Sequence, residues 1–311
     1  MDRDDALSPI LRSMRLSSGL ISRGHFSKPW AVHSKGAPFA IFHAVVEGSC
    51  VAQRDGDLVG TRLEPGELVL FTRGDPHTIS DGDGTRPRSI TTLPSRDVGG
   101  VAVVEHGGDG DGARILCGRF HLDHAAATLE ELLPPVIVIR KQQSRMVEWL
   151  DTTLGLISFE LDHRRDGSDE ILTRLTDILF VQVLRAYALN LQPGEGGWLG
   201  AAHDPRIAKA LALMHDQVDT PWTADLLARK VAMSRSAFYT RFTELVGETP
   251  SKYLTRWRMR VAMDLMRSAE ELSTWELAER VGYSSEDSFS RAFKRTLGVS
   301  PSVWRREQGE S

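Results

Sequence analysis

Residues 222–245 read Trp-Thr-Ala-Asp-Leu-Leu-Ala-Arg-Lys-Val-Ala-Met-Ser-Arg-Ser-Ala-Phe-Tyr-Thr-Arg-Phe-Thr-Glu-Leu, and the same pattern returns about fifty residues later. Thr223–Met233 superposes on Ser273–Tyr283 at a constant shift of 50, which places Leu227 on Leu277. Beyond the turn the shift is 51, and four identical pairs follow: Phe238 with Phe289, Phe242 with Phe293, Gly247 with Gly298, and Pro250 with Pro301. Because internal repetition fixes architecture before local patterns do, the chain is expected to contain two copies of one unit.

Each copy has the pattern of a helix, a short turn and a second helix. In the first copy, apolar residues recur at helical steps as far as Val231, and the small residue Ala232 lets the two helices approach at the turn. Gly282 has the same place in the second copy. Serine is favoured just before a helix because its oxygen accepts from free amides of the first turn. Ser234 and Ser284 are therefore expected to cap the second helices.

The second helix of each copy is expected to bury one face and to leave the other in solvent. The predicted buried set of the first copy is Ala237, Phe238, Phe242 and Leu245. Its outward set is Arg235, Ser236, Tyr239, Thr240 and Thr243. In the second copy the inward set is Phe289, Ala292, Phe293 and Leu297, and the outward set is Glu286, Asp287, Ser290, Arg291, Lys294 and Arg295.

One long helix is predicted between the copies, roughly from Pro250 to Arg267. Its apolar residues, such as Tyr253, Trp257 and Val261, follow three- and four-residue steps. About 17 residues at 1.5 Å per residue span roughly 26 Å, whereas successive major grooves on one face of DNA recur about every 34 Å. Bending of the DNA can absorb the difference, so the spacing suits two recognition helices in neighbouring grooves.

A long signature motif runs through the second copy. It consists of Arg280-Val281-Gly282-Tyr283-Ser284-Ser285, Phe289-Ser290-Arg291-Ala292-Phe293-Lys294-Arg295, Gly298-Val299-Ser300-Pro301 and Trp304-Arg305-Arg306. With this motif, residues 221–306 resemble the DNA-binding domain of the AraC/XylS family of bacterial transcription regulators. The resemblance implies that the chain binds double-stranded DNA.

The resemblance also implies that bases are read from both recognition helices. The implied readers are Ser236, Tyr239 and Thr240 in the first copy and Glu286, Asp287, Ser290 and Arg291 in the second. Arg291 is the strongest candidate, because arginine can form two hydrogen bonds with guanine. Arg235, Lys294 and Arg295 are expected to bind phosphates, with solvated surface charge as the alternative for each. Thr240 stands where several relatives have a basic residue, so the first helix is expected to read fewer guanines.

The sequence pattern between Trp30 and about residue 120 is not helical. Short apolar runs alternate there with turns rich in Asp and Gly, and the runs are 39–42, 49–52, 68–71, 101–104 and 115–117. Many short strands at close spacing indicate an antiparallel sandwich or barrel. Ahead of them, apolar residues at near-helical spacing within residues 5–25 predict one short helix.

Residues 66–77, Gly-Glu-Leu-Val-Leu-Phe-Thr-Arg-Gly-Asp-Pro-His, resemble the second motif of the cupin family, with Gly66, Gly74 and His77 at the family spacing. Thr72 stands where cupins prefer proline, and His43 is the best remnant of the first cupin motif. The region resembles the cupin-type sensor half found in one branch of the AraC family. This resemblance implies a cupin-like domain that senses a small molecule or a redox signal.

Residues 142–190 return to helical spacing and predict two amphipathic helices. Such helices usually bury their apolar stripe within the fold, so covering the barrel is the first interpretation. A dimer surface with partial heptad character is the alternative, and the family resemblance favours it. The composition of Gln192–Gly197 indicates a linker. The predicted domains are a cupin-like sensor over 1–140, a helical covering or dimerisation segment over 141–192, a linker over 193–204, and an AraC-type double helix-turn-helix domain over 205–306.

The runner-up function is a cupin metalloenzyme with a helical appendage. A catalytic metal usually needs three protein ligands, and only His43 and His77 stand at cupin-motif positions. Cys50 could complete such a set, but no motif places it there. We therefore expect no catalysis, no metal and no cofactor.

The two cysteines offer a further hypothesis, oxidant sensing. Cys117 lies at a predicted strand end near His121 and His124, and an imidazolium pointing at the thiol would lower its pKa. Cys50 lies on an alternating strand, where a cysteine is by default a small apolar core residue. The hypothesis is that Cys117 responds to oxidant, alone or paired with Cys50.

Composition sets the remaining bounds. The hydrophobic share is 41% of 311 residues, which allows two domains with separate cores. Two cysteines are too few for a disulfide framework, which fits a reducing cytoplasm. The chain starts without a signal-peptide pattern, and Pro134 and Pro135 interrupt its longest apolar run, so neither secretion nor membrane spanning is expected.

Residues 201–311 hold 17 Lys and Arg against 15 Asp and Glu, so DNA docking must depend on where the arginines lie.

Together these patterns predict an α+β chain: a cupin-like antiparallel barrel or sandwich with flanking helices, then an all-α domain of two helix-turn-helix units joined by a long helix. The expected function is sequence-specific, DNA-binding regulation of transcription, as an activator controlled by the sensor domain. The expected partners are promoter DNA, a second copy of the chain, RNA polymerase and an unidentified small-molecule effector, but no membrane.

Overall fold

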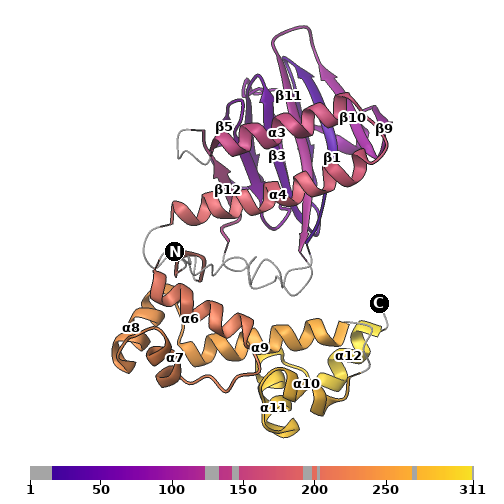
Figure 1. Cartoon of the computed structure of the whole chain (residues 1–311). Coiled ribbons are helices and arrows are strands. Elements are labelled where there is room, and N and C mark those ends of the chain that lie inside the picture. Colours follow the sequence, from indigo (N-terminus) through magenta and orange to yellow (C-terminus); the bar gives the residue numbers. More distant parts are fainter. Residues whose placement is uncertain are drawn as a thin grey trace. The chain divides into compact units, whose positions relative to one another are not determined.

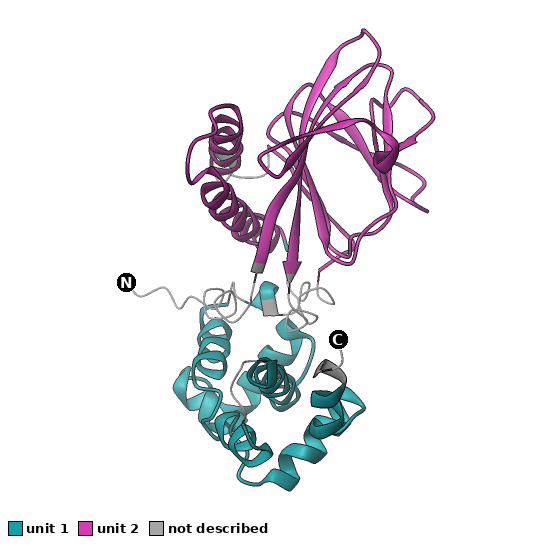
Figure 2. Cartoon of the chain, turned by 90° about the vertical axis from the view of Figure 1, so that its right-hand side faces the viewer, with its two compact units in different colours: residues 1–14, 191–311 teal, residues 15–190 magenta. Residues whose placement is uncertain are grey.

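The computed structural model describes residues 16–122, 133–141, 147–191, 198–201, 204–267 and 272–309. The chain divides into two compact units, one formed by Arg15–Asn190 and one that contains Leu191–Ser311 (Figure 2). Among these described residues, all strands and two long helices belong to the first unit, and the second unit is helical (Figure 1). The predicted linker Gln192–Gly197 lies outside the described residues. None of the helices in the described part of the chain is long and apolar enough to cross a membrane.

The first unit contains two β-sheets. The larger sheet has the strand order β12-β6-β3-β11-β1-β10-β9, and the smaller sheet has the order β5-β4-β7-β2-β8. The strand bounds are β1 Leu16–Ser27, β2 Ala31–Ser34, β3 Ala40–Glu47, β4 Cys50–Arg54, β5 Thr61–Leu63, β6 Leu68–Phe71, β7 His77–Ser80, β8 Arg88–Ser89, β9 Ser95–Val98, β10 Val101–Gly107, β11 Gly112–Leu122 and β12 Val136–Ile139. A short 3-10 helix, η1, spans Ile90–Thr92.

Most neighbouring strands run antiparallel, but two pairs are parallel. β1 pairs with β10 in parallel, with Ser22 opposite Ala102, and β2 pairs with β8 in parallel. The two sheets are therefore mixed. The five runs predicted as strands overlap β3, β4, β6, β10 and β11. Phe26, Trp30, Val69, Phe71 and Ile115 belong to the core cluster of this unit.

The helix expected within residues 5–25 is wrong over its described part, because Leu16–Ser27 forms strand β1. Two buried positions of this strand are serines, Ser18 and Ser22. Small polar residues on the buried face hide the apolar alternation that usually marks a strand. Ser18 is satisfied inside the fold, because its hydroxyl donates to a carboxylate oxygen of Asp177 at 2.7 Å.

Helices α3 (Val147–Asp162) and α4 (Ser168–Leu189) cover one face of the larger sheet (Figure 1). α4 contacts β1 and β12, and α3 contacts β3. Their buried apolar residues are Leu150, Leu154, Ile157 and Leu161 on α3, and Leu172, Leu179, Phe180, Val183 and Leu184 on α4. The covering interpretation is thus confirmed, and the dimer interpretation stays a prediction.

The second unit contains the repeated units. Its helices are α5 Trp198–Ala201, α6 Pro205–Asp216, α7 Ala224–Lys230, α8 Arg235–Val246, α9 Pro250–Arg267, α10 Thr274–Arg280, α11 Glu286–Leu297 and α12 Pro301–Gly309. The pairs α7–α8 and α10–α11 are the two helix-turn-helix copies. α9 joins them and has the bounds that its apolar pattern predicts.

The turns of the two copies differ by one residue, and this corrects one predicted cap. Ser234 caps α8 as expected, since its Oγ accepts from the amide of Ala237 at 3.2 Å. α11 is capped by Ser285 rather than Ser284, because the extra turn residue of the second copy moves the helix start. The turn residue is left-handed in both copies, with φ of 52° at Ala232 and 78° at Gly282.

The buried faces of α8 and α11 pack around phenylalanines. Phe238 and Phe242 are fully buried in the first copy, as are Phe289 and Phe293 in the second. Ala237 was expected to be buried but is exposed. The buried stripe of α8 follows Phe238 at four- and seven-residue steps, and a residue one position earlier lies about 100° away on a 3.6-residue helix.

Candidate nucleic-acid interface and sensor pocket

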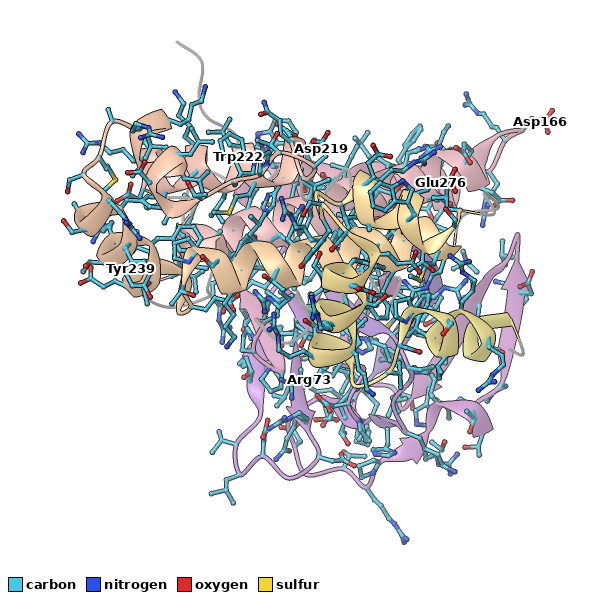
Figure 3. All side chains as sticks on the ribbon, turned by 90° about the horizontal axis from the view of Figure 1, so that it is seen from below. Arg73, Asp166, Asp219, Trp222, Tyr239 and Glu276 are labelled. Atoms are coloured by element: carbon cyan, nitrogen blue, oxygen red, sulfur yellow. The ribbon has the colours of Figure 1, made fainter. Side chains whose placement is uncertain are left out.

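The outward face of α8 carries the four residues that are predicted to contact DNA in the first copy. Arg235, Ser236, Tyr239 and Thr240 are all exposed, and the exposed fraction of Tyr239 is 46%. Tyr239 is labelled on this helix in Figure 3. Because the neighbouring Phe238 packs inward, the Tyr239 ring is left for contacts outside the fold. A recognition helix reads base edges through such outward side chains.

The outward face of α11 carries the six residues predicted for the second copy. Glu286, Asp287, Arg291, Lys294 and Arg295 are exposed, and Ser290 is half-buried. Acidic residues occupy the first turn and basic residues the last turn, an order that the helix dipole favours. Among the described residues, the side chains of the three basic residues have no hydrogen-bond or ion-pair partner. Their charges are therefore available to phosphates and base edges.

A groove of about 800 Å³ lies between α8 and the start of α6. Its lining includes Ser236 and Thr240 of the predicted interface, together with Asp204 and Arg241. Arg241 donates from Nε to an Asp204 carboxylate oxygen at 2.9 Å, and the same carboxylate caps α6. This ion pair fixes the start of α6 beside the recognition helix.

Arg258 on α9 makes a link that the sequence pattern did not reveal. Its guanidinium donates from Nε to the Val218 carbonyl oxygen at 3.1 Å and from Nη2 to the Thr220 carbonyl oxygen at 2.7 Å, both in the segment that precedes α7. The guanidinium carbon also lies 5.5 Å from the centre of the Tyr283 ring, in the turn of the second copy. Burial lowers the pKa of Arg258. One side chain therefore connects the segment before the first copy to the turn of the second.

The sensor unit brings three of the four predicted sensor residues together. His43 on β3 lies opposite Cys117 on β11 in the larger sheet, and His77 comes from β7 in the smaller sheet. The Sγ atom of Cys117 is 2.8 Å from Nδ1 of His43, and Nε2 of His43 is 2.7 Å from Nε2 of His77. Nδ1 of His77 lies 2.7 Å from the Asp75 carbonyl oxygen. Cys50 is instead buried in the core of the unit.

Burial favours the neutral form of each group in this cluster. It lowers the pKa of His43 well below the ordinary value, with His77 as a second cause. It also lowers the pKa of His77, against the opposing effect of the bond to Asp75. It raises the pKa of Cys117 to about 12, against the opposing effect of a hydrogen bond with Ser22.

The expected lowering of the Cys117 pKa by a nearby imidazolium is therefore wrong. The imidazole that contacts the thiol is His43, whose ring is held neutral by burial. His121 lies on the exposed side of β11, and His124 is outside the described residues. Burial likewise raises the pKa of Cys50 to about 12.

The cluster lines a cavity of about 110 Å³ between the two sheets. His43, His77 and Cys117 form its polar part, together with Ser22 and Ser34. Most of the apolar wall consists of isoleucines: Ile21, Ile41, Ile79, Ile90 and Ile115. The cavity is thus mostly apolar, with a few hydrogen-bonding groups gathered at one place, which is the usual composition of a small-ligand pocket.

The cluster has the geometry of a hydrogen-bond chain rather than of a metal site. Across the described ranges, no three His, Cys, Asp or Glu side chains are placed to hold a metal ion. His43 contacts Cys117 through one ring nitrogen and His77 through the other. Metal ligands must converge on one point, whereas these three groups form a row.

The second unit carries two helix-turn-helix units joined by one helix, and the first unit has a cavity between two sheets. Together these features define a class of protein, a two-domain transcription regulator. Residues 5–188 match the family described as Cupin, and residues 227–307 match the family described as Helix-turn-helix domain. The chain belongs to the AraC-like transcription regulators that combine these two domains. The predicted family, fold class and regulatory function are thereby confirmed.

Several relatives match this chain over nearly its whole length. The HTH-type transcriptional regulator AlkR of Acinetobacter baylyi is 31% identical over 97% of this chain and 99% of its own length. A putative AraC-like transcription regulator of Streptomyces antibioticus is 32% identical over 97% of each chain. RclR of Escherichia coli, named an RCS-specific HTH-type transcriptional activator, is 28% identical over 97% of each chain.

Proposed function

We propose that this chain is a transcriptional activator that engages promoter DNA with both helix-turn-helix units, under the control of a small-molecule or redox signal received by its cupin-like unit. The observation that carries the proposal is the pair of outward faces on α8 and α11, where all ten predicted interface residues are exposed or half-buried. RNA polymerase is the further partner that activation of transcription requires. The relative RclR is itself named an activator.

Within this interface, Arg291 reads guanine, and Arg235, Lys294 and Arg295 bind phosphates. An arginine with a free guanidinium on a recognition helix is suited to the two acceptors of guanine in the major groove. The acidic Glu286 and Asp287 at the start of α11 would repel phosphates and are suited instead to the amino group of cytosine.

Affinity measurements on a site selected from random DNA test this assignment. Arg291→Ala is expected to weaken binding by about 1–3 kcal/mol and to relax the base preference at one position. Arg86→Ala is the matched control, because Arg86 is an exposed arginine between β7 and β8 in the other unit. Unchanged affinity and preference in Arg291→Ala, or an equal loss in both variants, would contradict the assignment.

The division of labour that we propose follows the domain boundaries expected from the sequence: sensing in residues 1–140, dimerisation in 141–192, a linker over 193–204 and DNA binding in 205–306. Ligand in the cavity beside His43 and His77 changes which arrangement of the sensor or dimer is populated. That arrangement sets whether both helix-turn-helix units engage DNA, and the coupling is reciprocal. Effector should therefore change DNA affinity, and DNA should change effector affinity by the same factor.

The homodimer surface that we propose is the exposed face of α3 and α4. The exposed fractions are 63% for Trp149 and 50% for Leu156 on α3, and 45% for Ile171 and 44% for Ile178 on α4. Each helix spaces its two residues seven positions apart, the repeat of a coiled-coil seam. Large apolar side chains at this spacing on two adjacent helices favour a second copy of the same helices as the partner.

Sedimentation analysis of Leu156→Glu and Ile178→Glu tests the dimer. Both variants are expected to sediment as monomers at concentrations where the wild type is dimeric, since a charge cannot enter the interface unpaired. Leu58→Glu is the matched control, because Leu58 is 98% exposed and lies between β4 and β5. A wild type that is monomeric throughout, or a dimer that survives both substitutions, would refute this surface.

A further inference from the structure

The contacts in the sensor cavity fix the direction of a hydrogen-bond chain. A carbonyl oxygen only accepts, so Nδ1 of His77, which faces the Asp75 carbonyl oxygen at 2.7 Å, carries the proton. In the neutral ring Nε2 of His77 is then an acceptor, and Nε2 of His43 must donate to it. Nδ1 of His43 is consequently unprotonated. It accepts from the Cys117 thiol, whose sulfur lies 2.8 Å away.

Cys117 therefore rests as a neutral thiol whose proton points at a base. A buried cysteine without such a partner is inert, because the thiolate is the nucleophile and burial opposes its formation. Here His43 can take the proton in the same step in which sulfur attacks. The developing negative charge on sulfur would then face two donors, the protonated Nδ1 of His43 and the hydroxyl of Ser22, which hydrogen-bonds the same sulfur.

The cavity restricts which reagents reach this thiol. Most of its apolar wall is isoleucine, and its volume is about 110 Å³. An ionised reagent would lose its hydration there without gaining a charged partner, which is strongly unfavourable. Because an apolar cavity of about 150 Å³ holds benzene, this smaller cavity suits an uncharged molecule of about four to six heavy atoms.

We propose that Cys117 is a covalent modification site for small uncharged electrophiles of the α,β-unsaturated carbonyl class. Sγ attacks the β-carbon of the electrophile while the thiol proton passes to Nδ1 of His43. The π electrons of the C=C bond move onto the carbonyl as an enolate, and the enolate α-carbon then takes the proton from His43. One C–S bond and one C–H bond form, while one S–H bond and one C=C π bond break. The addition needs no oxidant and releases no leaving group.

The same strand offers a route by which an adduct is sensed. Cys117 faces the cavity, and Phe120 on β11 is fully buried with its ring centre 4.9 Å from that of Phe180 on α4. Displacement of β11 by an adduct is thereby passed to α4, the helix assigned above to dimerisation. This sensing role rests on the proposed function, whereas the covalent addition itself does not.

Intact-mass analysis of the purified full-length chain treated with methyl vinyl ketone near neutral pH tests the addition. One adduct per chain is expected for the wild type and for Cys50→Ala, which removes the other cysteine, and none for Cys117→Ala. His43→Gln is expected to slow the addition about 100-fold, the contribution typical of a general base. The addition rate of the His43→Gln variant should also rise about tenfold per pH unit, because attack then needs free thiolate. The addition rate of the wild type should change little with pH.

Three results would overturn the proposal. The first is an adduct on Cys50 instead of Cys117, and the second is no adduct in the native chain although the urea-unfolded chain reacts. The third is an equal rate, with an equal pH profile, for the wild type and His43→Gln. Iodoacetate, a charged probe, is expected to leave Cys117 unmodified until the chain unfolds. Oxidation of Cys117 by hydrogen peroxide in a chain that resists the ketone would replace electrophile addition by a redox site.

The DNA affinity of the modified chain tests the sensing role of Cys117 separately from its role as a modification site. A changed affinity supports sensing through Cys117, and an adduct without any change in affinity or oligomeric state overturns the sensing role while supporting the modification site. Absence of specific DNA binding by both the unmodified and the modified chain would contradict the proposed function, whatever the mass analysis shows.

Discussion

Replacing Gly282 with alanine should disrupt the link between the two helix-turn-helix copies. Gly282 has a φ of 78°, a conformation that is strained for residues with a Cβ. A Cβ built there would lie 2.5 Å from Nη2 of Arg258 and 2.7 Å and 2.8 Å from the carbonyl oxygens of Asp219 and Val218. These distances are too short for real contacts. The guanidinium of Arg258 can move aside, whereas the two carbonyl oxygens can move only with the backbone before α7, so the loss of the Arg258 contacts is the smallest cost expected.

The expected loss of unfolding free energy follows from these contacts. Left-handed strain at an alanine costs about 1 kcal/mol, and this cost is partly offset because alanine restricts the unfolded chain. Displacing Arg258 breaks its bond to Thr220, a charged hydrogen bond worth about 2 kcal/mol. Gly282→Ala should therefore destabilise the helical unit by roughly 3 kcal/mol and weaken DNA binding, because the two copies are no longer held together through Arg258.

Ala232→Gly is the matched control, since Ala232 has the same turn position in the first copy with a φ of 52°. In Ala232→Gly, the relief of left-handed strain stabilises the folded chain, and the added freedom of glycine stabilises the unfolded chain. Because the two effects nearly cancel, the free energy of unfolding should change by no more than about 1 kcal/mol. Urea unfolding followed by tryptophan fluorescence measures both variants. A loss below about 1 kcal/mol for Gly282→Ala would refute the reasoning, since the left-handed strain of the alanine alone would then account for it.

Three further outcomes are expected. Burial lowers the pKa of His215 to about 3. Below about pH 6.5 the unfolded chain therefore takes up a proton at His215, whereas the folded chain does not. The free energy of unfolding is expected to be highest above that pH and to fall by about 2 kcal/mol by pH 5. Urea unfolding at both pH values checks this, and an equal loss in His215→Gln would contradict it. Lys294→Ala should lower the slope of log affinity against log salt by about 1 while leaving base preference unchanged, as titrations at several salt concentrations would show. Ser285→Ala should cost about 1 kcal/mol of unfolding free energy and Ser284→Ala close to none; equal losses in thermal unfolding would mean that the cap is assigned to the wrong serine.

The helical unit was largely predictable because its information is local and repeated. The two copies align residue by residue, and Phe238, Phe242, Phe289 and Phe293 take the buried positions that their spacing predicts. Apart from Ala237, which is exposed, the error is a one-residue error at the turn, where Ser285 rather than Ser284 caps the helix. Such an error arises because adjacent serines are chemically equivalent and only the turn geometry selects one of them.

The sensor pocket was less predictable because it depends on contacts between distant strands. His43 and His77 could be singled out by the cupin resemblance, but nothing local indicated that Cys117, rather than Cys50, would stand beside His43. The strand register decides this, and register comes from long-range pairing. Arg258 was missed for a similar reason, since its partners lie 38 and 40 residues away at backbone carbonyl groups that no sequence pattern marks.

Footprinting of the full-length chain on its selected DNA site tests the central claim most directly. Two protected segments on one face of the DNA, about one helical turn apart, are predicted for each copy of the chain. Tyr239→Ala should weaken protection of one segment, and Arg291→Ala should weaken protection of the other. A single protected segment, or the same segment affected by both substitutions, would contradict the account that both helix-turn-helix units read DNA.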